Sequence, residues 1–269
     1  MHELNVTSRV FANNSTDSFI DRMATTFKYE KVCPLTTGGD ATEAAIKLAR
    51  SWGRRVKGIP DGTVPLILST ADCFHGRSIG AVSMTTDAKA RDGFGPFVPG
   101  IGSVCPFNNR VIRFGCAKDL KEALNQHGQQ TVAFIYEPVQ GDAAAVVPPS
   151  DYLKQCRELC TKHNVLMIAD EVQTGLGRTG HMVASLGLFN VRPDILLLGK
   201  SLSGGVVPTS VVMASEAVMA GFPPGSHGSS FGGSPLASIA PMACLDVIEE
   251  EGLCENARIM GAYFKEQLY

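Results

Sequence analysis

The sequence lacks the features of a membrane, secreted or nucleic-acid-binding protein. No apolar run approaches the ~18–20 residues that a membrane span requires. Residues 1–5 carry neither the basic nor the apolar stretch of a signal peptide, so we expect none. The net charge of −2 gives no electrostatic reason to bind nucleic acid or a membrane surface. Hydrophobic residues make up 44% of the chain and charged residues 19%, which is typical of a globular protein.

The eight cysteines include no CxxC pair. Cys156 and Cys160 are four residues apart and would share one face of a helix, where they could contribute to a metal site or act as small buried side chains. Because no histidine stands at ligand spacing, we favour burial and expect no metal. Scattered cysteines indicate a reducing compartment, and we expect the cytoplasm, with the mitochondrial matrix as an alternative.

Residues 196–205 are the stretch around which the rest can be interpreted. An apolar run ends at Lys200 and small residues follow it, so a buried strand would present one amine at its carboxyl end, where open α/β sheets bind ligands. Such a position would remove water from the amine and favour its neutral, nucleophilic form. Residues 165–170 repeat the pattern and end in Asp170. A lysine and a carboxylate at two strand ends are what pyridoxal phosphate requires. Taken singly, a surface lysine and a helix-capping aspartate are the more ordinary interpretation.

Two further segments have the composition of a cofactor site. Gly38 and Gly39 open a helical pattern, and bare amides at the positive end of a helix dipole suit a phosphate, although a glycine turn before a helix is more often structural. Phe74 and Arg77 follow an apolar run at 65–69, where an aromatic ring can stack on a cofactor and a guanidinium can bind a carboxylate. Core packing and a surface ion pair are the alternatives for these two residues. For His75, a structural hydrogen bond and contact with a cofactor are equally open.

Strand and helix patterns alternate along the chain. Apolar runs predict strands at 65–69, 132–136, 165–170, 196–198 and 210–213. Helical patterns cover 15–27, 119–127, 150–163 with Ser150 as its cap, a long stretch from Pro235, and 256–269. Residues 86–110 should form a long loop. This alternation predicts an α/β fold with a mainly parallel sheet. We expect 1–34 to lead into a ligand-binding domain at 35–250, with a C-terminal region beginning at 251–269.

Together these segments resemble the class III pyridoxal-phosphate aminotransferases. The resemblance is carried by Lys200, Asp170, the Gly38–Gly39 turn and the segments 74–77 and 137–141, and it extends over nearly the whole chain. It implies an aspartate-aminotransferase-type (fold type I) large domain, with pyridoxal 5′-phosphate as the cofactor. It also implies that members of the family extend beyond both ends of this chain, with a small C-terminal domain beyond residue 269.

The resemblance assigns roles to individual residues. Lys200 would form the Schiff base and transfer the proton, and Asp170 would keep the pyridine nitrogen protonated. Cofactor contacts are implied for a group of residues around them: Gly38, Gly39, Phe74, Gln173 and Ser230. Ser230 occupies the place of a hydroxyl that reaches the phosphate of a neighbouring subunit, so a homodimer is implied. Substrate contacts are implied for Arg77, Glu137 and Asp142.

Within the class, the loop at 92–97 favours the branch that acts on L-ornithine. The implied reaction transfers the δ-amino group of L-ornithine to 2-oxoglutarate, giving glutamate 5-semialdehyde and glutamate. Acetylornithine or 4-aminobutyrate as substrate, and a catalytically impaired cofactor-binding fragment, are the alternatives. The family usually has glutamate where this chain has Asp142, paired with an arginine beyond residue 269. The shorter aspartate would need backbone movement or a bridging water to make that pair.

Overall fold

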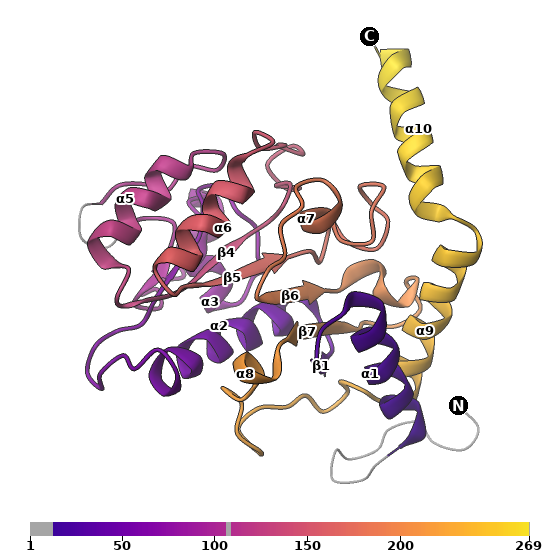
Figure 1. Ribbon diagram of the computed structural model, residues 1–269, viewed down its shortest axis with the longest axis horizontal. Coiled ribbons are helices and arrows are strands. Elements are labelled where there is room, and N and C mark those ends of the chain that lie inside the picture. The colour runs from indigo at the N-terminus through magenta and orange to yellow at the C-terminus, as the bar shows by residue number, and fades with distance from the viewer. Residues whose placement is uncertain (1–12, 106–108, 269) are drawn as a thin grey trace.

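The computed structural model describes residues 13–105 and 109–268, and its centre is one seven-stranded sheet (Figure 1). The strand order is β1-β7-β6-β5-β4-β2-β3. The strands are β1 Lys31–Leu35, β2 Leu66–Leu68, β3 Ile101–Gly102, β4 Thr131–Tyr136, β5 Leu166–Asp170, β6 Ile195–Leu198 and β7 Ser210–Ala214.

The sheet is mainly parallel, as the sequence predicts. Strands β3, β2, β4, β5 and β6 pair in parallel, whereas β7 pairs antiparallel with both β6 and β1. Two antiparallel pairings restore the direction, so β1 runs the same way as β6. The carboxyl ends of six strands therefore meet at one edge of the sheet, where open α/β sheets bind ligands.

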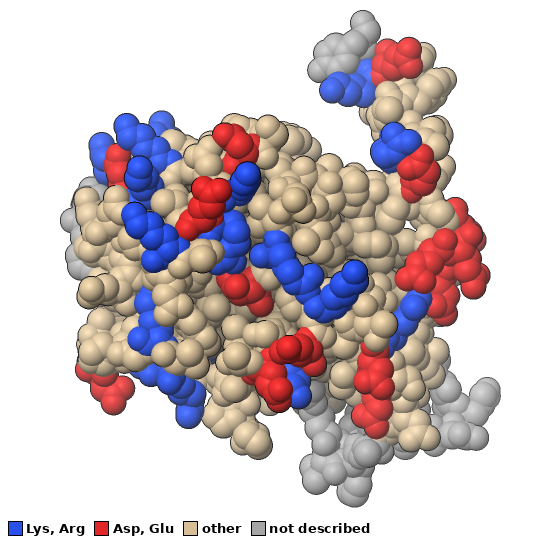
Figure 2. Space-filling view, in the orientation of Figure 1, with Lys and Arg blue, Asp and Glu red and all other residues tan. Residues whose placement is uncertain are grey.

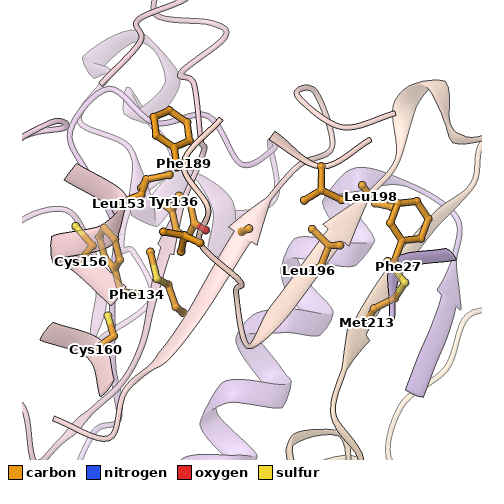
Figure 3. Close-up of a cluster of buried hydrophobic side chains, with 14 of the residues drawn as sticks. Phe27, Phe134, Tyr136, Leu153, Cys156, Cys160, Phe189, Leu196, Leu198 and Met213 are labelled. Carbon is orange, nitrogen blue, oxygen red and sulfur yellow. The ribbon is translucent and has the colours of Figure 1, made fainter. Parts of the chain in front are cut away.

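The central strands are apolar on both faces because helices cover both faces. Every residue of β4, β5, β6 and β7 is buried, as expected for a sheet enclosed between helix layers. Successive side chains alternate between two separate cores. Figure 3 shows part of the first core, in which Phe134, Tyr136, Leu196 and Leu198 point to the same face.

The helices form the layers on either side of the sheet. They are α1 Asn14–Phe27, α2 Gly38–Arg55, α3 Ile79–Met84, α4 Ala88–Arg91, α5 Ala117–His127, α6 Tyr152–Lys162, α7 Ala184–Gly187, α8 Glu216–Met219, α9 Pro235–Glu250 and α10 Leu253–Leu268. A 3₁₀ turn, η1, spans Lys200–Ser203. Helix α2 packs on the face opposite to α1, α5, α6 and α9, because their buried residues belong to different cores. Cys156 and Cys160 are buried in the first core, which agrees with their interpretation as small core side chains.

Helix α10 stands apart from the layers and has no buried residue (Figure 1). On the face shown in Figure 2, side chains of both charges are interspersed, and acidic side chains gather along α9. Within residues 13–105 and 109–268, no helix is both long and apolar enough to cross a membrane.

Three details of the sequence-based element boundaries are wrong. Ser150 does not cap α6: the helix begins at Tyr152, after Asp151, and no side chain bonds its first amides. The expected loop at 86–110 contains α4 and the short strand β3, since Ile67 and Ser69 donate backbone hydrogen bonds to Gly100 and Gly102. The last helix starts at Leu253 rather than at residue 256.

Candidate active site

A cavity of about 190 Å³ lies at the carboxyl edge of the sheet. Three neighbouring parallel strands each deliver a charged residue to it: Glu137 follows β4, Asp170 ends β5 and Lys200 follows β6. The remaining lining residues come from the start of α2, the segment after β2 and the turns after β4 and β5: Gly38, Gly39, Phe74, His75, Gly76, Asp142, Val172, Gln173 and Thr174. The sequence-predicted lysine and carboxylate therefore share one cavity.

Asp170 is a buried carboxylate held by two hydrogen bonds. Nδ1 of His75 donates to its Oδ2 at 2.7 Å, and the backbone N–H of Val172 donates to its Oδ1 at 3.1 Å. Asp170 is only 5% exposed, and His75 only 4%. Burial alone opposes protonation of His75, but Cys73 and the bond with Asp170 outweigh it and raise the pKa of His75. The carboxylate of Asp170 therefore favours the protonated form of His75.

His75 also has an unsatisfied atom. Its Nε2 is buried and has no hydrogen-bond partner within the described part of the chain. The backbone of His75 is held by a separate hydrogen bond, because the Thr42 hydroxyl of α2 donates to the carbonyl of His75 at 2.9 Å. An unpaired buried polar atom beside a cavity is unfavourable in the absence of a ligand or water.

Lys200 occupies a sharp turn at the end of β6. Its φ is 47°, in the left-handed region that is unusual for a residue with a Cβ atom, and it opens η1. Within the described residues, its side chain makes no hydrogen bond or ion pair. Lys200 is exposed, so the expected loss of water from its amine is not met in this chain on its own. The residue lines the cavity but is still accessible to solvent.

The amino end of α2 forms another wall. Thr37 caps the helix, and its side chain and that of Asp40 form a reciprocal capping box. Because the first intrahelical bond is from Ala41 N to Thr37 O, the amides of Gly38 and Gly39 lie in the turn whose N–H groups the helix does not use. A Cβ atom on Gly38 would lie 2.8 Å from Val172, so only glycine lets the helix approach the segment after β5 so closely.

Glu137 is buried, and both of its oxygens bond to backbone. The N–H of Phe74 donates to Oε2 at 3.0 Å, and the N–H of Gly141 donates to Oε1 at 3.4 Å. Burial raises the pKa of Glu137, while His75 and the two amides oppose that rise. The carboxylate therefore joins the segment after β2 to the turn after β4.

Of the other residues singled out from the sequence, two line the cavity and two do not. Gln173 and Asp142 line the cavity, and the Gln173 side chain has no hydrogen-bond partner within the described residues. Arg77 is exposed and lies outside the cavity, with its guanidinium 5.5 Å from the centre of the Phe74 ring. Ser230 is also exposed and outside the cavity. Their binding roles stay predictions.

Val172 and Glu171 were missed by sequence reasoning. Val172 lies between Gly38 and Gly199, within 3.3 Å of where Cβ atoms on these glycines would be. Glu171 is buried and accepts from Thr174 Oγ1, Ala184 N and Ser185 N at 2.6–3.0 Å, which fixes the turn that carries Gln173. The signal available in the sequence was their position directly after the strand that ends in Asp170.

This fold and site define a class of protein, and comparisons with known proteins agree. The family model described as "Aminotransferase class-III" matches residues 1–269. The chain therefore belongs to the class-III aminotransferase family.

Its similar relatives are named ornithine aminotransferases. The chain is 45% identical over 263 residues to one from Schizosaccharomyces pombe, covering 98% of this chain and 60% of that protein. It is 46% identical to a mitochondrial one from Arabidopsis thaliana, covering 100% and 54%. A crystal structure of the Toxoplasma gondii ornithine aminotransferase superposes with a TM-score of 0.91 at 42% identity, covering 98% and 60%. The chain thus spans about 54–60% of the length of these relatives.

Proposed function

We propose that the chain is the cofactor-binding part of a pyridoxal-phosphate-dependent ornithine aminotransferase. The observation that carries the proposal is one cavity holding a buried, hydrogen-bonded carboxylate, Asp170, together with a partner-free amine, Lys200. The names of the relatives support ornithine as the amino donor. The proposed reaction moves the δ-amino group of L-ornithine to 2-oxoglutarate. Residues 35–250 are the proposed ligand-binding domain.

The side chains and amides of the cavity fit pyridoxal phosphate. Asp170 offers a carboxylate to a pyridine N–H, Gln173 offers a free amide to the phenolic oxygen, and Lys200 offers an amine to the aldehyde. The unused amides of Gly38 and Gly39 suit the phosphate. Phe74 lines the same cavity and presents a ring for stacking. When bound, the cofactor supplies an electron-accepting ring and an aldehyde that condenses with amines.

The protein's own contribution is to hold groups and to move one proton. Lys200 would take the proton from the substrate carbon that carries the amine and deliver it to the cofactor, acting first as general base and then as general acid. Asp170 would face the ring nitrogen, and the hydrogen bond from His75 holds its carboxylate in place. Arg77 and Asp142 are the proposed contacts for the charged ends of the substrate.

A homodimer is part of the proposal. Ser230 and Arg77 lie outside the cavity formed by one copy. Ser230 sits in an exposed stretch next to Phe231, which is 56% exposed, so a second copy could receive this segment. The relatives from A. thaliana and S. pombe differ in whether their names include a mitochondrial location, and we propose the cytoplasm for this chain.

The test is the visible absorption spectrum of the purified chain with pyridoxal phosphate, recorded before and after adding L-ornithine. We expect a band from the lysine-bound cofactor that ornithine bleaches, and formation of glutamate 5-semialdehyde when 2-oxoglutarate is present. Lys200→Ala should lack the band. A band that ornithine leaves unchanged would indicate a cofactor-binding fragment without its substrate site. Absence of any band in the unmodified chain would overturn the proposal.

A second candidate is a related donor, acetylornithine or 4-aminobutyrate. The chain also superposes on the acetylornithine aminotransferase of Elizabethkingia anophelis with a TM-score of 0.82 at 37% identity. Asp142 stands where the family resemblance leads one to expect glutamate, and it is exposed at the cavity wall. Initial rates with the three amines at equal concentration separate the candidates, and a faster rate with either alternative would reject ornithine.

A further inference from the structure

Glu137 is a buried carboxylate whose oxygens bond only to backbone amides, with His75 as the nearby group that opposes the rise in its pKa. It is 6% exposed, and within the described residues it forms no salt bridge. Its partners are two backbone amides, those of Phe74 and Gly141. Burying a carboxylate is unfavourable, and here burial raises the pKa of Glu137. An apolar residue at this position would avoid that term but would leave the amides of Phe74 and Gly141 without their acceptors.

The two amides belong to different segments, of which only Phe74 lines the cavity itself. Phe74 lies in the wall after β2, and Gly141 lies in the turn after β4. A Cβ atom built on Gly141 would be 1.3 Å from Oε1 of Gln173, so the backbone at Gly141 packs directly on the Gln173 amide. Glu137 therefore connects the backbone of Phe74, whose ring lines the cavity, to the backbone of Gly141, which packs on the Gln173 amide.

A second link joins the same two segments but reaches no cavity-lining group. Nε2 of Gln140 donates to the carbonyl of Ala71 at 2.7 Å and to the hydroxyl of Thr70 at 3.2 Å. This link can hold the turn after β4 against the segment after β2 when Glu137 is changed. What Glu137 adds is the placement of Phe74 and Gly141 themselves.

We propose that Glu137 is a positioning residue that sets the spacing between Phe74 and Gln173, and with it the slot for an aromatic ligand. This role differs from the substrate contact that the family resemblance implies. It rests on the proposed function only for the identity of the ligand, pyridoxal phosphate. We call the two hydrogen bonds from Phe74 and Gly141 to Glu137 the clamp. The clamp is present in the ligand-free chain and can be tested without any cofactor.

The first measurement is amide hydrogen exchange by NMR in the ligand-free chain, comparing Glu137→Gln with the unmodified protein. The glutamine keeps one acceptor oxygen and turns its NH₂ group toward the other amide. We expect exchange at Phe74 and Gly141 to become ~10-fold faster or more. Exchange at Val172, which donates to Asp170, should not change. Glu158→Gln, an exposed carboxylate on α6, controls for the lost charge. Unchanged exchange at both amides would overturn the clamp.

The second measurement uses pyridoxal phosphate itself. Loss of one charge-assisted bond in the wall should weaken cofactor binding by ~10- to 100-fold and change the induced circular dichroism of the bound ring. Aspartate is one methylene shorter than glutamate, so Glu137→Asp should keep one of the two bonds. Its cofactor affinity should lie between those of the unmodified chain and Glu137→Gln. It also replaces Glu137→Gln if that variant fails to fold.

The outcomes separate the two proposals. If the unmodified chain binds no cofactor, the proposed function fails, and hydrogen exchange still decides the clamp. If exchange increases but the affinity and dichroism of bound cofactor stay the same, the clamp exists and its positioning role is rejected.

Discussion

The carboxyl ends and the amino ends of the parallel strands, here called the carboxyl edge and the amino edge of the sheet, carry similar polar residues whose hydrogen bonding differs. At the carboxyl edge, Lys200 and Gln173 have no partner within the described residues. At the amino edge, Lys57 donates from one Nζ to three backbone carbonyls, those of Gly128, Thr131 and His163, at 2.6–3.0 Å. Nearby, Tyr29 donates to the carbonyl of Pro193 at 2.9 Å.

The difference separates groups kept for a ligand from groups that hold the fold. Lys57 joins the end of α2 to the turns that precede β4 and β5, so it fastens three segments distant in sequence. Arg157 and Asp194 make a similar link at 2.6 Å, and Asp194 also accepts from the N–H of Met167 at 2.7 Å. Lysine at one edge is therefore expected to matter for activity, and lysine at the other for stability.

Replacing Lys200 should produce the largest effect on activity. Lys200→Ala removes both the amine that binds the cofactor and the group that moves the proton, so the turnover rate should fall by ~10⁴-fold. Since Lys200 is exposed and makes no bond, and alanine keeps a Cβ atom at the same φ of 47°, thermal unfolding should change little. Steady-state kinetics and a melting curve check both parts. Substantial residual turnover would place the chemistry elsewhere.

Replacing Asp170 should come next. Asp170→Asn keeps the shape but removes the charge beside the proposed ring nitrogen, and the neutral side chain no longer holds the proton on His75 as strongly. We expect turnover to fall by ~10²–10³-fold, with cofactor still bound. The test is to isolate Asp170→Asn with cofactor bound, record its absorption spectrum and measure its turnover rate. Equal rates for the two proteins would mean that Asp170 does not contact the ring.

Lys57 gives the contrasting result at the other edge. Lys57→Met keeps the aliphatic stem but removes the donor that three partly buried carbonyls share, so the free energy of unfolding should fall by ~1–3 kcal/mol. Denaturant titration measures the loss, and cofactor affinity should be unchanged. Lys162→Met, an exposed lysine that borders the same hollow, is the matched control and should be neutral. A similar loss in both variants would indicate a general effect of charge.

The residues at the carboxyl edge could be predicted from the sequence, whereas the hydrogen bonds of Lys57 at the amino edge could not, and the reason is physical. Lys200 and Asp170 end long apolar runs, and that pattern alone places them at the carboxyl ends of buried strands. The contact between His75 and Asp170 spans 95 residues, so no local pattern predicts it. Lys57 follows a helix and precedes Gly58, as many surface lysines do, and its three carbonyl partners come from distant turns.

Local backbone geometry explains which sequence-based predictions were wrong. Lys200 was expected to be buried, but the turn at φ 47° carries it out to solvent. Ser150 was expected to cap α6, but Pro149 O accepts from Tyr152 N in a turn that delays the helix. The paired bonds of Glu137 depend on where two loops meet, which only the folded chain defines.

The smallest predicted effect is the pH dependence of the amino edge. Burial lowers the pKa of Lys57 from 10.5 to about 8, and Cys160 opposes that shift. Between these two values the unfolded chain binds more protons at Lys57 than the folded chain, so the Lys57 contribution to the free energy of unfolding rises with pH. The difference in stability between the unmodified chain and Lys57→Met should therefore grow from pH 8 to pH 10.

Other titrating groups should cancel in that difference. His127 and His163 face the same hollow, and burial lowers the pKa of each below 6.5, outside the window. Burial raises the pKa of Cys160 to about 12, above the window. Urea titrations of both proteins at four pH values measure the difference. A difference that shrinks as pH rises would mean that the three carbonyls stabilise the ammonium form more than burial opposes it, and the amino edge would then act as a site that prefers a cation.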